Sequence, residues 1–181
     1  MVINTSRFGK VEITNDDLFV FSEGLLGFSD FRNFVLLDDP NDEIFAWLQS
    51  CEVPEVAFPV LEPEIFVPDY NPQIAKKDLE ILKVGVSTKL RCFTIITIPD
   101  DPTQMTANLK APIVINASQR IARQCVLSDN SLAIREPIFG KLQQRVFKNP
   151  AASIKGATSE WGVAVVKLPA KAPERSPETS I

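Results

Sequence analysis

The chain has 181 residues, of which 45% are hydrophobic and 23% are charged, the composition of one globular domain with a substantial core. It carries a net charge of −4 and contains no His, so it lacks the side chain most often used for proton transfer and metal binding. The N-terminus shows no signal-peptide pattern and no apolar run is long enough to span a membrane, so a cytoplasmic location without membrane contact is predicted.

The first predicted elements are two short strands. Residues 8–14 alternate polar and apolar side chains, residues 15–17 are Asn-Asp-Asp, and residues 18–21 form an apolar run. This pattern predicts a β-hairpin. Gly24 and Gly27 follow, and they indicate either a backbone that approaches a ligand or, as the favoured interpretation, a tight turn with positive φ near one end of a barrel.

Most of the remaining chain consists of apolar runs of four to eight residues bounded by Pro, Asp, Asn or Gly, as is typical of an antiparallel barrel or sandwich. These runs are residues 34–37, 44–48, 56–61, 91–98, 112–115 and 121–127. Residues 76–83 have the period of a short helix. The predicted fold class is mainly β, a small antiparallel β-barrel-like domain with one or two short helices. Trp47 is expected in its core, with Gln49 and Ser50 at the rim.

Between residues 33 and 75 the sequence contains nine carboxylates and no Lys or Arg. Because these carboxylates alternate with predicted strands, folding would fix the charges in place, and we expect a surface that receives a basic partner. The nine residues, which we call the acidic block, are Asp38, Asp39, Asp42, Glu43, Glu52, Glu55, Glu62, Glu64 and Asp69.

The three cysteines, Cys51, Cys92 and Cys125, are widely spaced and form no CxxC pair. Without His to complete a ligand set they do not predict a zinc site, and no metal or other cofactor is expected. Two of them lie inside apolar runs, where a thiol behaves as a small hydrophobe. We therefore expect buried, reduced thiols.

Two segments are candidates for partner contact. In the first, Pro68 and Pro72 stiffen a stretch that places the only Tyr of the chain beside a carboxylate, as interface anchors do, although a structural tyrosine fits equally well. In the second, residues 105–112 mix polar and apolar side chains in a turn-rich connection. Its Met and Leu either offer apolar contact or plug a barrel end, and the sequence leaves both interpretations open.

The charge changes sign near the C-terminus, because residues 1–138 sum to −8 and residues 139–181 to +4. We predict a barrel domain over 1–138 and a basic C-terminal extension over 139–181, with an amphipathic segment at 139–147 and a strand at 161–168. The extension is expected to be disordered from Pro169 onward. Its positive sum suggests that it folds over the acidic face as a built-in competitor.

A small barrel enzyme acting through carboxylates is an alternative interpretation, because adjacent Asp pairs occur at residues 16–17, 38–39 and 100–101. Each pair borders a turn, and capping of backbone N–H groups is the favoured role. An RNA-binding barrel is a second alternative. Arg120 and Arg123 suit a phosphate clamp, but the negative sum over the barrel repels phosphates and no basic stripe is interleaved with aromatics. We predict no catalysis and no direct nucleic-acid binding.

Taken in order, several of these segments resemble the flagellar assembly factor FliW family, over about residues 1–138. The most specific is the run Met105-Thr106-Ala107-Asn108-Leu109-Lys110-Ala111-Pro112-Ile113-Val114-Ile115-Asn116. The others are Phe8-Gly9, Glu23-Gly24-Leu25-Leu26-Gly27-Phe28, Phe34-Val35-Leu36-Leu37, Trp47-Leu48-Gln49-Ser50 and Phe66-Val67-Pro68-Asp69-Tyr70. Residues 139–181 exceed the length of the short members of this family.

The resemblance implies a cytosolic β-barrel-like protein that is not an enzyme and that switches between two protein partners. One is CsrA, a basic RNA-binding repressor of flagellin translation, and the other is flagellin before export. Binding of CsrA would relieve repression, and accumulating flagellin would restore it. Five residues combine the motif match with a loop position and are partner-binding candidates: Asp69, Tyr70, Asn108, Leu109 and Pro112.

Overall fold

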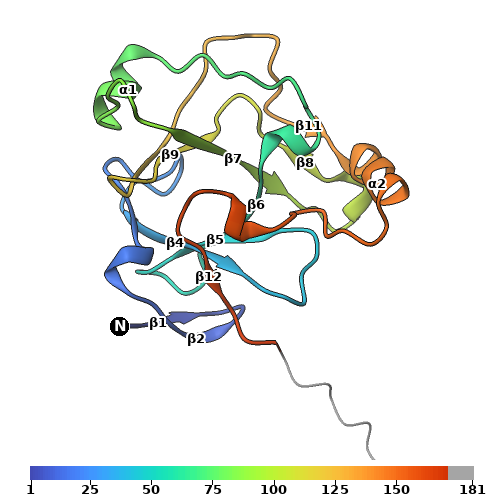
Figure 1. Ribbon diagram of the computed structural model, residues 1–181, viewed down its shortest axis with the longest axis horizontal. Helices are drawn as coiled ribbons and strands as arrows, with labels where there is room; N and C mark the ends of the chain where they lie inside the picture. Colours follow the sequence, from blue (N-terminus) through green and yellow to red (C-terminus); the bar gives the residue numbers. More distant parts are fainter. Residues whose placement is uncertain (171–181) are drawn as a thin grey trace, which may run out of the picture.

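The computed structural model describes residues 1–170 and shows a barrel of seven strands that closes on itself (Figure 1). The ring runs in the order β7, β6, β5, β4, β3, β10, β9 and closes where β9 pairs with β7. Neighbouring strands are antiparallel except for β3 and β10, which run parallel. The ring strands are β3 (Phe19–Phe21), β4 (Asn33–Asp38), β5 (Ala46–Ser50), β6 (Ala57–Leu61), β7 (Leu90–Thr97), β9 (Ile113–Asn116) and β10 (Ile121–Gln124).

Alternation along each strand sends one set of side chains into the barrel, as β4 illustrates. Phe34 and Leu36 belong to the interior cluster, whereas Val35 and Leu37 pack in a second core outside the ring. The interior is apolar and receives side chains from every ring strand. Its buried ring members are Phe19, Phe21, Phe34, Leu36, Ala46, Leu48, Val60, Phe93, Ile113, Ile115 and Ala122.

Other elements cover the outside of the ring. A hairpin of β1 (Val2–Thr5) and β2 (Gly9–Glu12) joins the outer core through Ile3 and Val11. Helix α1 (Lys76–Ile81) is followed by Leu82, which packs against β9. The remaining short elements before residue 139 are β8 (Thr106–Ala107), β11 (Glu136–Pro137) and the 3-10 helices η1 (Asn15–Asp17), η2 (Pro63–Ile65) and η3 (Pro102–Gln104).

Residues 139–168 fold back across the barrel, and we call them the C-terminal arm. The arm contains helix α2 (Phe139–Lys148), the 3-10 helix η4 (Thr158–Glu160) and strand β12 (Val166–Lys167). Figure 1 shows it in orange to red, running from α2 across the face of the barrel to β12 beside β4. Trp161 of the arm is 3% exposed and joins the interior cluster, with its ring centre 4.9 Å from that of Phe93. The arm therefore completes the barrel core.

The predicted fold class is confirmed. Each of the six apolar runs corresponds to one ring strand, β4 to β7, β9 and β10. The predicted helix at 76–83 corresponds to α1, and the predicted amphipathic segment at 139–147 corresponds to α2. The boundary placed after Ile138 stays a prediction. The disorder expected from Pro169 onward falls mostly on residues 171–181, which lie outside the described residues.

The predicted N-terminal hairpin is wrong. Strand β2 pairs with β1, which was not predicted, and β3 pairs with β4 and β10. The reason lies in the Asn-Asp-Asp segment, which forms η1 instead of a hairpin turn. The Asp17 carboxylate accepts a hydrogen bond from the backbone N–H of Thr14 at 2.7 Å, and this capping box redirects the chain.

The rim position predicted for Gln49 and Ser50 is also wrong, because both side chains are fully buried. The Gln49 amide donates to the carbonyl oxygens of Ser50, Pro54 and Val56 at 3.0, 3.2 and 3.2 Å. The carbonyl groups of Pro54 and Val56 also accept backbone N–H groups, from Ser6 at 3.0 Å and from Ser50 at 2.9 Å. The connection from β5 to β6 thus gathers acceptors that satisfy the N–H groups of a buried amide.

The tight turn predicted at the two glycines is confirmed. Gly24 and Gly27 have φ values of 65° and 82°, and a Cβ on Gly24 would lie 2.6 Å from the carbonyl oxygen of Phe28. Phe28 and Phe31 pack against the interior cluster, as expected for side chains at one end of the barrel.

Replacing Trp161 with Ala tests whether the arm is part of the core. We expect the free energy of unfolding to fall by about 3–5 kcal/mol, because the substitution leaves a cavity beside Phe93. The matched control is Phe147→Ala on α2, where the ring is 86% exposed and the change should stay within about 0.5 kcal/mol. Urea unfolding followed by circular dichroism measures both, and equal stability of the two variants would contradict the prediction.

Candidate partner-binding surface

The two candidate segments of the sequence meet at one hydrogen bond. The Tyr70 hydroxyl donates to the carbonyl oxygen of Leu109 at 2.7 Å, and both residues are buried. This bond ties the rigid segment after η2 to the connection between β8 and β9. The structure therefore brings together candidates that lie 39 residues apart in the sequence.

The five candidates differ in exposure. Asp69 is exposed, and Asn108 is half-buried, with its Oδ1 accepting hydrogen bonds from two backbone N–H groups of its own turn at 3.2 and 3.1 Å. Tyr70, Leu109 and Pro112 are buried. Asp69 and the exposed part of Asn108 can therefore contact a partner directly. The other three candidates are buried and support this surface from beneath. A partner-binding role stays a prediction for all five.

The nine carboxylates of residues 33–75 do not form one open face. Asp42 accepts a hydrogen bond from the indole N–H of Trp47 at 3.0 Å, and Glu52 accepts one from the side-chain amide of Asn33 at 2.9 Å. These two acids lie in the connections that precede and follow β5, at opposite ends of the barrel. Part of the acidic block is therefore used to shape turns.

Asp38 at the end of β4 is covered by the arm. Its carboxylate lies 2.6 Å from Lys155 Nζ and accepts a hydrogen bond from the Thr158 hydroxyl, and Lys155 also donates to the carbonyl oxygen of Asp39 at 2.8 Å. The side chains of Asp38 and Lys155 are 13% and 6% exposed. Burial raises the pKa of Asp38, but the Lys155 ammonium and the Thr158 hydroxyl outweigh it and hold that pKa below its usual range.

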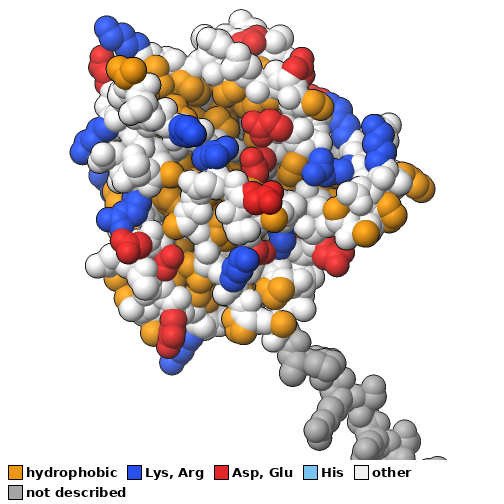
Figure 2. Space-filling view, in the orientation of Figure 1, with side chains coloured by type: hydrophobic (Ala, Val, Ile, Leu, Met, Phe, Trp, Pro, Cys, Tyr) orange, Lys and Arg blue, Asp and Glu red, His pale blue; other side chains and the backbone are white. Residues whose placement is uncertain are grey.

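Other carboxylates line an open hollow next to this ion pair. Glu62, Glu64 and Glu160 surround a space of about 290 Å³ together with Arg145. Figure 2 shows Asp and Glu side chains gathered in the middle of this face, with Lys and Arg side chains on both sides. Burial and the charge of Glu64 raise the pKa of Glu62, and the charge of Arg91 offsets this only in part. A cation supplied by a partner would relieve the crowding of negative charge.

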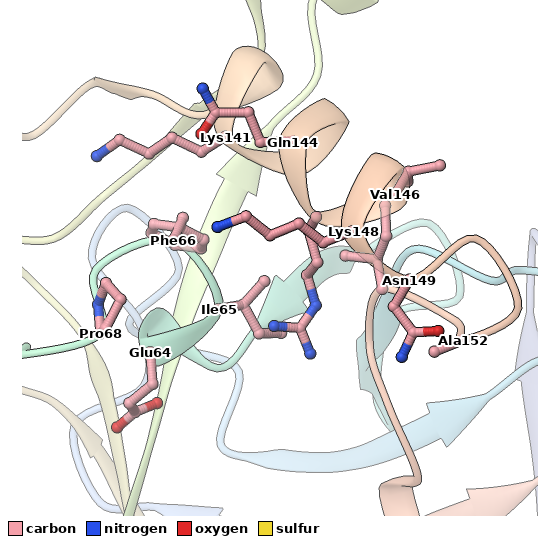
Figure 3. A pocket seen from close by; sticks show the side chains of 12 residues that line it. Glu64, Ile65, Phe66, Pro68, Lys141, Gln144, Val146, Lys148, Asn149 and Ala152 are labelled. Carbon is pink, nitrogen blue, oxygen red and sulfur yellow. The ribbon is translucent and has the colours of Figure 1, made fainter.

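A larger groove of about 640 Å³ separates η2 from α2 (Figure 3). Ile65 and Phe66 form one wall, and Lys141 and Lys148 extend from α2 across the groove toward them. The arm thus places its cations along the border of the acidic hollow.

Three further features of residues 1–170 concern metal binding, membrane spans and the thiols. Residues 1–170 contain no group of three or more Asp, Glu or Cys side chains placed to hold a metal ion. No helix within them has both the length and the apolar character needed to cross a membrane. The three cysteines are free, and burial raises the pKa of each thiol to about 12.

Three residues of this surface, Lys155, Glu160 and Trp161, were not among the predicted site residues. The available signal was the positive sum of residues 139–181, which suggested a segment folded over the acidic face. The Lys155–Asp38 ion pair shows that the arm covers one part of the acidic block. Competition with a partner stays a prediction.

Replacing Lys155 with Met tests the ion pair. We expect unfolding free energy at pH 7 to fall by about 3–5 kcal/mol, because the Asp38 carboxylate is left charged and buried. The lowered pKa of Asp38 means that the contribution of the pair is present above the unfolded pKa of about 4 and is lost as the pH falls through the folded value. Urea denaturation from pH 7 to pH 3 should show the difference between wild type and variant shrinking, and a constant difference would contradict the assignment.

Comparison with known proteins agrees with these features. A family model described as FliW protein matches residues 2–138. The flagellar assembly factor FliW of Bdellovibrio bacteriovorus is 65% identical over 164 residues, covering 91% of this chain and 94% of the relative. That of Thermoanaerobacter pseudethanolicus is 38% identical and covers 79% of this chain and 96% of the relative. A crystal structure of the flagellar assembly factor FliW has a TM-score of 0.70 and 32% identity, and covers 77% of this chain and 97% of that one. By sequence and by fold, the chain belongs to the FliW family of flagellar assembly factors.

Proposed function

We propose that this protein is a cytoplasmic flagellar assembly factor that binds CsrA and flagellin in turn and catalyses no reaction. CsrA held in this way does not repress flagellin translation, and flagellin that accumulates before export displaces CsrA and restores repression. Such a switch needs only two affinities that compete for one pool of protein. The observation that carries the proposal is membership of the FliW family over residues 2–138.

The open carboxylates support CsrA, a basic protein, as one partner. Glu62 and Glu64 crowd each other in the hollow beside the arm, and Asp69 is exposed on the segment that follows η2. A basic surface is drawn to such charges before contact, which raises the association rate. Asp69, Tyr70, Asn108, Leu109 and Pro112 remain the proposed partner-binding residues, with Asp69 making the direct charged contact.

Exposed apolar side chains support flagellin as the other partner. Ile44, Val146 and Phe147 are 36%, 44% and 86% exposed, and they border an apolar hollow of about 340 Å³ beside α2. The terminal helices expected in unassembled flagellin are amphipathic and unpaired, and a hydrophobic groove suits them.

Calorimetric titration of the purified protein tests the proposal. We expect binding to CsrA and to flagellin, and displacement of CsrA when flagellin is added to the preformed complex. The affinity for CsrA should fall as salt rises from about 50 to 500 mM, because exposed charges are screened. Absence of binding to both partners would contradict the proposal, whereas salt-independent binding of CsrA would contradict only the role of the carboxylates. A mobility shift of flagellin leader RNA without CsrA would favour the RNA-binding alternative.

Replacing Asp69 with Lys tests the residue that carries the exposed charge. We expect CsrA affinity to fall about tenfold, because a repulsive contact replaces an attractive one at the border of the interface. Thermal stability should barely change, since the side chain is exposed. Asp30→Lys in the connection between β3 and β4 is the matched control with the same charge change. Equal affinity in the two variants would contradict a charged contact at Asp69. A loss of stability without a loss of affinity would assign Asp69 to the fold.

A further inference from the structure

Strand β4 has a backbone edge that the other ring strands leave partly unpaired. β5 pairs with residues 34–37 along one edge of β4, whereas β3 pairs only with residues 33 and 34 along the other. On this second edge Leu37 and Asp38 pair in parallel with β12 of the arm. The backbone N–H of Leu168 donates to the carbonyl oxygen of Asp38 at 2.8 Å. The arm thus adds a strand to an edge that the ring does not fill.

Side-chain contacts hold the arm on this edge along its length. Lys155 binds the Asp38 carboxylate at 2.6 Å, and Trp161 enters the interior cluster. Gly162, with a φ of 72°, lies so close to Arg91 that an added Cβ would be 2.8 Å from the guanidinium. The arm therefore covers three features that lie side by side. These are the buried carboxylate of Asp38, the apolar site that Trp161 fills, and the open edge of β4.

The arm lies beyond the part of the chain that most relatives share. The family model ends at residue 138. The matched crystal structure is covered to 97% by only 77% of this chain, so little of that molecule is left to form an arm. The Bdellovibrio relative aligns with 91% of this chain, which requires that it share part of the arm. Shorter members of the family therefore have the barrel without this cover.

We propose that the edge of β4, together with Asp38, is a docking site for a basic, strand-forming segment of a partner protein, and that residues 153–168 occupy it in cis in this chain. The arm itself displays the chemistry that the site accepts: a Lys for Asp38, an apolar side chain for the interior slot, and an extended backbone for the open edge. This inference rests on the proposed function in that CsrA is the basic partner.

Occupation in cis has a measurable consequence for affinity. A partner reaches the edge only in molecules whose arm has left it, so the apparent affinity is reduced by the fraction of open molecules. Weakening the arm without altering Asp38 therefore strengthens partner binding, whereas the same change weakens binding if the arm is itself the contact surface.

Two substitutions weaken the arm at different contacts. Leu168→Pro removes the N–H that pairs with Asp38, and Lys155→Gln removes the buried cation. We expect the Kd for CsrA, measured by calorimetry at one salt concentration, to fall about tenfold in each variant. Ala170→Pro and Lys148→Gln are the matched controls, because neither residue makes a backbone hydrogen bond or an ion pair with the open edge of β4, and their Kd should stay within twofold of wild type. Circular dichroism establishes folding, and Lys155→Gln carries the test where Leu168→Pro does not fold.

Hydrogen exchange distinguishes two explanations of a changed Kd, release of the arm and a change of surface charge. In wild-type protein saturated with CsrA, we expect the amides of residues 153–168 to lose protection while those of β4 stay protected. An unchanged or higher Kd in Lys155→Gln, or an arm that stays protected in the complex, overturns the inference and leaves the proposed function intact. Failure of wild type and variants alike to bind CsrA removes both.

Discussion

Strand β4 imposes the constraint on which the rest of the structure depends. Its side chains are buried on both faces, in the interior cluster and in the outer core, so its backbone has no access to water and its polar groups must be paired. β5 satisfies one edge, but β3 has only three residues and satisfies a fraction of the other. The C-terminal arm pairs with Leu37 and Asp38 on that edge, so a segment distant in sequence contributes to the pairing of this strand.

The C-terminal end of β4 connects the core of the barrel to its acidic surface. Asp38 is the last residue of β4, and its charge is retained in a buried place because Lys155 and Thr158 neutralise and solvate it. The neighbouring Glu62 and Glu64 form no ion pair among the described residues, and they face an open hollow that Arg145 also lines. Asp38 of the acidic block is therefore used by the fold, whereas Glu62 and Glu64 stay open to the partner proposed above.

Sequence patterns predicted those features that depend on local chemistry. The runs that became β4 to β7 are apolar because these strands are buried on one or both faces, so length and boundary residues were enough to place them. β1 was missed because it has only four residues, and two of them, Asn4 and Thr5, are polar. The partner of β2 could not be inferred, since Asn-Asp-Asp suits a hairpin turn and a 3-10 helix equally.

Contacts between segments that are far apart in the sequence could not be predicted from it. Gln49 is polar, and only the positions of three carbonyl groups show that it belongs inside. Likewise, the sum of charges could indicate that the arm meets acids but not that Lys155 meets Asp38. Tyr70 and Leu109 are partner-binding candidates by sequence, and the sequence could not indicate that the two are joined by a hydrogen bond within the outer core.

The raised pKa of Glu62 makes this surface sensitive to pH. Its pKa is raised by burial and by Glu64 in the free protein, and a cationic partner seated beside it would lower that pKa again. By linkage, a complex with such a partner at this hollow would weaken as the pH falls through the pKa of Glu62.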